Sequence, residues 1–208
     1  MSPSQRIGLI DYGAGNLLSV RNALQSLGVD ARMVRSPDGL EGLEKLVLPG
    51  VGAFGDCSEN LRSAGLWEPV RAWVAADRPY LGICLGYQIL FEGSEECAGA
   101  PGLGVFPGKV VRFPARAGLK VPHMGWNEVR QTSRAAAFWQ GIPDRTHYYF
   151  VHSFHPVPAE PALAAGWTDY AGEFAAAAAS GRVWGVQFHP ERSQNAGLRL
   201  LRNFLDFA

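Results

Sequence analysis

A cysteine flanked by glycines is the first feature of this sequence that suggests chemistry. In "RPYLGICLGYQ" (78–88), Cys84 ends a short apolar run, and Gly82 and Gly86 stand two residues away on either side. Small residues around a nucleophile let a strand turn sharply into a helix, which exposes the reactive atom above a sheet. The helix predicted to start at Leu85 would point its N–H groups at the sulfur and stabilise a thiolate, and the Leu85 N–H would serve as an oxyanion donor. The motif alone is equally compatible with a buried structural cysteine.

A histidine followed by an acid supplies the partners that such a thiol needs, because a nucleophile requires a base and the base requires an orienting group. Among five histidines, His189 ends an apolar segment in "VQFHPE", and Glu191 follows two residues later. Residues i and i+2 of an extended chain share a side, and Pro190 favours the extended form. An isolated pair of this kind is more often incidental, but together with Cys84 it predicts a Cys-His-Glu triad.

Two glycine-rich stretches, "DYGAGN" (11–16) and "LPGVGAFGD" (48–56), raise the possibility of phosphate binding. Neither has the spacing of a P-loop or of a dinucleotide-binding loop, which disfavours that interpretation. The second stretch follows an apolar run, and a flexible turn there would offer another backbone N–H to an oxyanion. An ordinary tight turn is the alternative for both.

Composition sets outer limits on the protein class. The 208 residues, 47% hydrophobic and 18% charged, predict one globular domain over 1–208. Lys plus Arg and Asp plus Glu both number 19, which argues against a nucleic-acid partner. We find no signal peptide and no apolar run long enough for a membrane span. Three cysteines without a CxxC pair favour the reducing cytoplasm, with no disulfide framework, metal site or cofactor.

Strand-like and helix-like segments alternate through residue 93. We predict strands in 6–13, 30–36, 45–56 and 79–84, and helices at 16–28, with Asn16 as the N-cap, and at 85–93. Residues 58–77 resemble two short helices that meet near Pro69. This alternation predicts a parallel sheet with helices on both faces.

The second half changes pattern. Strand-like segments at 102–114, 147–156, 162–170 and 183–191 follow one another without helices, and 195–208 forms an amphipathic helix. The alanine run at 174–180 favours a helix by propensity, but it is short and lies among strands, so we predict a strand. The fold class is therefore α/β, with a mostly parallel central sheet flanked by helices and an antiparallel extension.

Three motifs in this order and spacing, "PGVG", "GICLGYQ" and "VQFHPERS", resemble the class I (triad) glutamine amidotransferases, and the similarity runs along essentially the whole chain. Two further stretches, 11–24 and 122–129, are similar to the amidotransferase subunits of imidazole glycerol phosphate synthases, from histidine biosynthesis. The resemblance implies the flavodoxin-like class I amidotransferase fold.

The resemblance also implies roles for individual residues. Cys84 attacks the side-chain amide of L-glutamine, His189 moves the proton and Glu191 orients His189, so that ammonia leaves a glutamyl thioester that water then hydrolyses. The oxyanion donors implied are the N–H of Leu85 and a backbone N–H of the turn formed by Gly50, Val51 and Gly52, either preformed or after a peptide flip. The glutamine amino-acid end is held by Gln88 and by the main chain of 152–154, which includes Ser153 and Phe154.

The partner implied is a separate (β/α)8-barrel cyclase subunit that receives the ammonia. The residues expected at this interface are Asn16, Ser19, Met124, Trp126, Tyr149 and Arg192. Arg192 stands where the family usually has lysine and Phe154 where it usually has tyrosine. The arginine keeps the charge, but its planar fork allows a different salt bridge across the interface.

Three alternatives remain from the sequence. The chain could be an amidotransferase subunit for another biosynthetic synthase, a stand-alone cysteine hydrolase of γ-glutamyl compounds, or a non-catalytic regulatory protein on the same fold. A solitary hydrolase would not need an exposed surface at Met124 and Trp126. A non-catalytic relative would usually have lost one triad residue.

Overall fold

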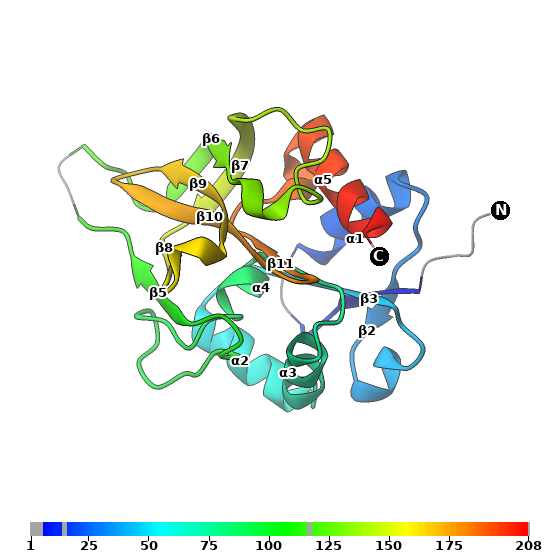
Figure 1. Cartoon of the computed structure of the whole chain (residues 1–208). Helices are drawn as coiled ribbons and strands as arrows, with labels where there is room; N and C mark the ends of the chain where they lie inside the picture. The colour runs from blue at the N-terminus through cyan, green and yellow to red at the C-terminus, as the bar shows by residue number, and fades with distance from the viewer. Residues whose placement is uncertain (1–5, 14–15, 116–117, 208) are drawn as a thin grey trace.

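The computed structural model describes residues 6–13, 16–115 and 118–207 (Figure 1). A nine-stranded sheet runs through the molecule. Neighbouring strands are parallel from β2 to β11 and antiparallel from β11 to β7. In sheet order the strands are β2 (Arg32–Val34), β1 (Ile7–Ile10), β3 (Lys45–Gly50), β4 (Tyr80–Cys84), β11 (Val183–Val186), β10 (Glu173–Ser180), β9 (Ala164–Asp169), β6 (His123–Gln131) and β7 (Thr146–His152).

Helices cover both faces of the parallel part (Figure 1). Alternate residues of the strands divide the core: Val47 packs with the residues of α1 and α5, whereas Leu46 and Leu48 pack with those of α2 and α3. The α-helices are α1 (Leu17–Ser26), α2 (Phe54–Ser63), α3 (Trp67–Ala75), α4 (Leu85–Gln88) and α5 (Gln194–Asp206), and the 3₁₀ helices are η1 (Pro37–Leu40), η2 (Ser133–Ala135), η3 (Pro161–Leu163) and η4 (Pro190–Arg192).

The predicted fold class is confirmed, and several details differ from the prediction. The helix pair at 58–77 breaks at Gly65, with φ +69°, while Pro69 lies inside the first turn of α3, where no backbone N–H is needed. The helix after Cys84 ends at Gln88 instead of residue 93. The strand β6 is absent from the prediction, because its mixed residues around Gly125 lack a clean alternation.

The antiparallel extension consists of β10, β9, β6 and β7, and the alanine run is a strand as predicted. Not every strand-like segment joins this sheet, however. Strands β5 (Gly108–Arg112) and β8 (Phe154–Pro158) pair with each other in a separate two-stranded ribbon. No helix within the described residues is both long and apolar enough to cross a membrane.

A buried lysine ties the C-terminal helix to the sheet. Lys45, at the start of β3, is 7% exposed, and its Nζ donates to Phe204 O at 3.2 Å, to Leu205 O at 2.7 Å and also to Phe207 O. A cation that binds the last carbonyls of a helix stabilises the negative end of its dipole. This contact therefore joins residues more than 150 positions apart in the chain.

We expect the Lys45→Met variant to lose about 2–3 kcal/mol of unfolding free energy, because it leaves these carbonyls without their donor. Urea unfolding followed by circular dichroism measures this loss. Lys109→Met, at an exposed position of β5, is the matched control and should change stability by less than about 0.5 kcal/mol. Equal stability of the two variants would show that the helix end gains nothing from the lysine.

Candidate active site

The carboxyl ends of three neighbouring parallel strands meet at one edge of the sheet. In β3 and β4, Gly50 lies opposite Cys84, and in β4 and β11, Ile83 lies opposite Val186. The chain therefore brings the glycine-rich turn after β3, the cysteine at the end of β4 and the segment after β11 side by side. Open α/β sheets bind their ligands at such an edge.

The backbone at Cys84 has the strained form expected of a nucleophile at a strand-to-helix turn. Its φ of 55° and ψ of −105° lie where residues other than glycine are rare, and this conformation costs on the order of 1–3 kcal/mol. The flanking glycines allow close packing around it. A Cβ on Gly82 would lie 2.1 Å from Gly86 O, and one on Gly86 would lie 1.8 Å from Leu48 O.

The histidine and the acid form a buried pair next to this sulfur. His189 Nδ1 lies 2.8 Å from Glu191 Oε1, and the two side chains are only 3% and 1% exposed. Nε2 of His189 is also buried and has no hydrogen-bond partner within the described residues. With Nδ1 engaged by the carboxylate, Nε2 is the ring nitrogen free to exchange a proton with a neighbouring group.

The electrostatics of this pair favour the protonated imidazole. Burial lowers the pKa of His189, but the neighbouring Cys84 sulfur and Glu191 carboxylate outweigh burial and raise it to about 10. The backbone around the ring is held on both sides. His189 N donates to Tyr149 O at 2.9 Å, and Ser193 Oγ donates to His189 O at 2.6 Å.

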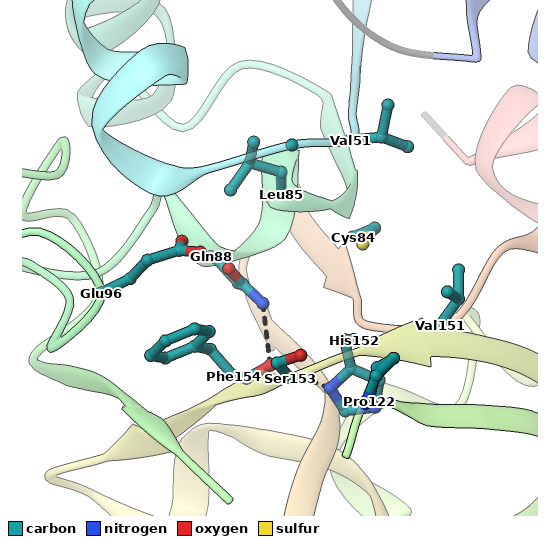
Figure 2. Close-up of a pocket in the computed structure, with 11 residues that line it drawn as sticks. Val51, Cys84, Leu85, Gln88, Glu96, Pro122, Val151, His152, Ser153 and Phe154 are labelled. Carbon is teal, nitrogen blue, oxygen red and sulfur yellow. Dashed lines mark hydrogen bonds between the residues drawn. The ribbon is translucent and has the colours of Figure 1, made fainter.

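A cavity of about 340 Å³ opens beside Cys84 (Figure 2). Of the predicted site residues, it contains Val51 and Gly52 from the turn, Cys84 and Leu85 from the elbow, and the expected glutamine contacts. His189, Glu191 and Gly50 do not line it. The lining residues are Val51, Gly52, Cys84, Leu85, Gln88, Glu96, Pro122, Val151, His152, Ser153 and Phe154.

Two glutamine side chains connect the cavity wall to the cysteine. Gln88 Nε2 donates to Phe154 O at 3.0 Å, drawn as a dashed line in Figure 2, and to Gln187 Oε1 at 3.0 Å. Gln187 Nε2 in turn lies 3.6 Å from Cys84 Sγ, within donating range for sulfur. The sequence does not single out Gln187, although its position two residues before His189 brings it next to the sulfur.

Glu96 lines the cavity, and the sequence does not single it out either. It lies in an irregular loop, and its Oε2 accepts a hydrogen bond of 2.8 Å from the N–H of Phe54, at the start of α2. In Figure 2 its carboxylate reaches toward Gln88 from the side of the cavity opposite Cys84. The cavity thus has a thiol on one side and a carboxylate on the other.

Other thiols and imidazoles nearby are poorly suited to catalysis. Burial raises the pKa of Cys57 to about 12, an effect that the neighbouring Tyr12 hydroxyl opposes only in part, so its thiol stays neutral. His152 lines the cavity, but both of its ring nitrogens have partners: Nε2 lies 2.9 Å from His123 Nδ1 and Nδ1 lies 2.8 Å from Phe154 O. His189 is therefore the better base for Cys84.

Comparison with known proteins decides the family. Residues 8–207 match the family model of the class-I glutamine amidotransferases. The chain belongs to this family. The resemblance inferred from the three sequence motifs is thus confirmed, and this chain is a glutamine amidotransferase.

Individual relatives agree with this assignment. Imidazole glycerol phosphate synthase subunit HisH of Nitrosococcus oceani is 50% identical over 202 residues, which cover 96% of both chains. The HisH subunit of Synechococcus sp. (strain JA-2-3B'a(2-13)) is 46% identical over 203 residues, covering 97% of this chain and 93% of that relative. A crystal structure of a glutamine amidotransferase matches with a TM-score of 0.71 and 25% identity, over 96% of this chain and 97% of that one.

The residues of this amidotransferase that were expected to contact a partner are contiguous on its surface. Met124 and Trp126 are 63% and 47% exposed, and Trp126 stacks edge-on against Tyr149, with ring centroids 6.2 Å apart. The guanidinium of Arg192 lies 5.8 Å from the centre of the Tyr149 ring.

Asn16 joins Arg192 to the start of α1. In the amide orientation that satisfies both ends, its Oδ1 accepts from Arg192 Nη2 at 3.1 Å and its Nδ2 donates to Ser19 Oγ at 2.8 Å. Asn16 occupies the predicted N-cap position, but its side chain caps no backbone N–H. Leu18, between Asn16 and Ser19 in the sequence, is 69% exposed. Across the described ranges, no three histidine, cysteine or acidic side chains gather as metal ligands.

Proposed function

We propose that this chain is the glutaminase subunit of an imidazole glycerol phosphate synthase, and that Cys84, His189 and Glu191 carry out the hydrolysis of glutamine. The observation that carries the proposal is the cavity beside Cys84, in a chain that matches HisH subunits over nearly its whole length. His189 Nε2, which has no hydrogen-bond partner among the described residues, supports it. The chain acts as one amidotransferase domain. We expect it to work in the cytoplasm, where its three free cysteines would stay reduced.

The reaction proceeds in two steps. The sulfur of Cys84 adds to the side-chain carbonyl carbon of glutamine, and the carbon–nitrogen bond breaks as His189 gives its proton to the leaving nitrogen. This step releases ammonia and leaves a thioester. His189 then accepts a proton from water, whose oxygen attacks the thioester, and glutamate leaves as the sulfur of Cys84 is regenerated.

The oxyanion formed in each step faces the turn after β3. Backbone N–H groups of Leu85 and of the turn formed by Gly50, Val51 and Gly52 are the proposed donors. The φ of +104° at Gly52 requires a residue without a side chain, which leaves this part of the turn open to a substrate oxygen. Preorganised donors of this kind typically contribute a factor of about 10²–10³ to turnover.

Substrate specificity comes from the end of the cavity that is opposite Cys84. We assign Glu96 to the ammonium group of glutamine, because a carboxylate there matches its charge. Gln88 and the main chain at Ser153 and Phe154 hold the rest of the amino-acid end. The loss of the tyrosine hydroxyl at Phe154 matters little, since its backbone carbonyl makes the contact with Gln88.

The partner is a (β/α)8-barrel cyclase subunit that receives the ammonia. We propose that it covers the surface formed by Asn16, Ser19, Met124, Trp126, Tyr149 and Arg192. Burying a large exposed tryptophan and methionine favours association, and aromatic residues, methionine and arginine are enriched at such interfaces. Val51 at the cavity wall is half-exposed as well.

A glutaminase assay with and without the cyclase subunit tests this function. We expect the purified chain alone to hydrolyse little glutamine. In the complex, with the nucleotide substrate of the cyclase subunit bound, the rate of hydrolysis should be about 10- to 100-fold higher, a typical coupling between sites. Glutamate release measures both rates. Substantial turnover by the chain alone, with no increase on adding the cyclase subunit, would favour a stand-alone γ-glutamyl hydrolase.

A further inference from the structure

Two buried histidines beside the cavity belong to no step of the reaction above. His123 on β6 and His152 on β7 lie directly opposite each other and are 4% and 6% exposed. His123 Nδ1 is 2.9 Å from His152 Nε2, and His152 Nδ1 is 2.8 Å from the carbonyl oxygen of Phe154. Burying two imidazoles in contact is unfavourable unless each ring nitrogen has a hydrogen-bond partner of the right kind, a donor or an acceptor.

The contacts determine where the protons sit. A carbonyl oxygen only accepts, so His152 must carry its hydrogen on Nδ1. If His152 is neutral, its Nε2 is then an acceptor, and His123 must donate from its own Nδ1. The remaining nitrogen, Nε2 of His123, must accept in turn.

Asn127 provides the hydrogen-bond donor that Nε2 of His123 requires. Its Nδ2 lies 3.3 Å from His123 Nε2 and 3.0 Å from Asp169 O, and its Oδ1 accepts the N–H of Glu128 at 2.9 Å. The orientation of the amide is therefore set by two backbone groups. Every hydrogen along Asn127, His123 and His152 has one consistent position.

Beyond His152, this series of hydrogen bonds reaches the substrate cavity at Phe154. The carbonyl of Phe154 accepts from both His152 and Gln88, and Gln88 continues through Gln187 to the sulfur of Cys84. The carbonyl that positions Gln88 is thus itself held by the histidine pair. If the N–H of His152 were lost, the Phe154 carbonyl would lose one of its two side-chain donors and be held less precisely, although Phe154 stays paired with Arg112 of β5.

Burial supports this arrangement of protons. It lowers the pKa of His123 to about 4 and holds the pKa of His152 well below its ordinary value, against the opposing effect of the Phe154 carbonyl. A second proton on His152 would also set two N–H groups against each other across 2.9 Å. Both rings are therefore neutral at neutral pH.

We propose that His123 and His152 are positioning residues for glutamine hydrolysis, which hold the carbonyl of Phe154 and, through it, Gln88 in the orientation that binds the substrate. This proposal rests on the proposed function and adds two residues to its site. Neither ring exchanges a proton with the substrate. Their loss should raise KM for glutamine and leave the nucleophile intact.

His123→Phe separates this role from packing. The ring of His123 stacks between Tyr170, at 3.9 Å, and Phe150, at 4.8 Å between centroids, and phenylalanine keeps this stacking while removing both nitrogens. In the complex with the cyclase subunit, we expect KM for glutamine to rise about tenfold, since a buried acceptor loses its donor. Ammonia-dependent synthesis should stay unchanged, and so should alkylation of Cys84 by iodoacetamide, which needs no glutamine recognition.

Variants at His152 supply a rescue test. The amide nitrogen of asparagine occupies roughly the place of Nδ1, so His152→Asn retains a donor for Phe154, whereas His152→Leu has none. We expect the leucine variant to raise KM as His123→Phe does, and the asparagine variant to recover most of that loss. His147→Phe, at an exposed position of β7, is the control and should leave KM unchanged.

Nitrogen-15 NMR of histidine-labelled wild-type protein shows directly which ring nitrogens carry hydrogen, whether or not the variants fold. Both rings should show a hydrogen on Nδ1 and none on Nε2 at pH 7. An Nε2–H form, a doubly protonated ring, or an unchanged KM in a folded His123→Phe variant would overturn the proposal. Absence of glutaminase activity in the wild-type complex would instead contradict the proposed function.

Discussion

Cys84→Ala is expected to abolish glutamine-dependent synthesis by the assembled enzyme and to leave ammonia-dependent synthesis intact. Without the sulfur no thioester forms, and removing a nucleophile from a triad lowers turnover by on the order of 10⁴-fold or more. Ammonia supplied in solution bypasses this step because it reacts at the cyclase subunit. Parallel assays with glutamine and with an ammonium salt, at a saturating concentration of the cyclase subunit's nucleotide substrate, measure the two activities.

Cys57→Ala provides the matched control for this experiment. Cys57 is buried, as Cys84 is, but lies in α2, outside the cavity lining. Burial holds the pKa of its thiol at about 12, so the same exchange removes a sulfur that does no chemistry. Glutamine-dependent synthesis by Cys57→Ala should stay within a few-fold of wild type. If the Cys84→Ala complex still used glutamine, another group would be the nucleophile.

The proposed catalytic cysteine, the histidine and the glycine-rich turn can be brought together from the sequence because each lies at or just after the end of a buried strand. Short apolar runs followed by glycine or proline mark the ends of β3, β4 and β11, and parallel neighbours bring those ends to one edge. Cys84, His189 and the glycine-rich turn could therefore be combined without any knowledge of the strand order. The strained conformation at Cys84 also follows from the local pattern, since Gly82 and Gly86 leave room for it.

The rest of the site depends on contacts that no local pattern encodes. Glu96 lies in a loop without periodicity, and only the tertiary fold brings it to the N-terminus of α2 and the cavity. The pairing of His123 with His152 requires β6, and the sequence does not predict this strand because it contains a glycine and mixed polar residues. The antiparallel second half contributes the end of β7, with Val151 and His152, and the start of β8 at Phe154, and the sequence predicts no break between these two strands.

Glu191→Gln is the second change with a large expected effect. Its side chain is 1% exposed and lies 2.8 Å from His189 Nδ1, so glutamine preserves the shape while removing the charge. The ring then loses the negative charge that stabilises its protonated form and selects its tautomer. We expect the rate of glutamine hydrolysis to fall by about 10³- to 10⁴-fold, with KM changed little. Steady-state glutaminase kinetics of the complex measure both quantities.

Glu173→Gln is the control for loss of a carboxylate. Glu173 forms an exposed pair with Arg130 at 2.8 Å, and exposed pairs contribute little to stability or to a distant site. Its hydrolysis rate should remain within about twofold of wild type, because surface substitutions away from a site have small effects. Equal losses in both variants would show that carboxylate removal acts through the fold and not through His189.

The pH dependence of stability gives Glu191 a second, independent readout. The folded state raises the pKa of His189 from 6.5 to about 10, so folding favours the protonated ring. That stabilisation is complete below pH 6.5, where the unfolded chain is protonated as well, and it disappears as pH rises toward 10. Glu191 supplies part of it, and the loss of unfolding free energy in Glu191→Gln should therefore be larger at pH 6 than at pH 9. Urea unfolding at both pH values measures this difference, and a loss that is the same at both would mean that the carboxylate orients a neutral ring.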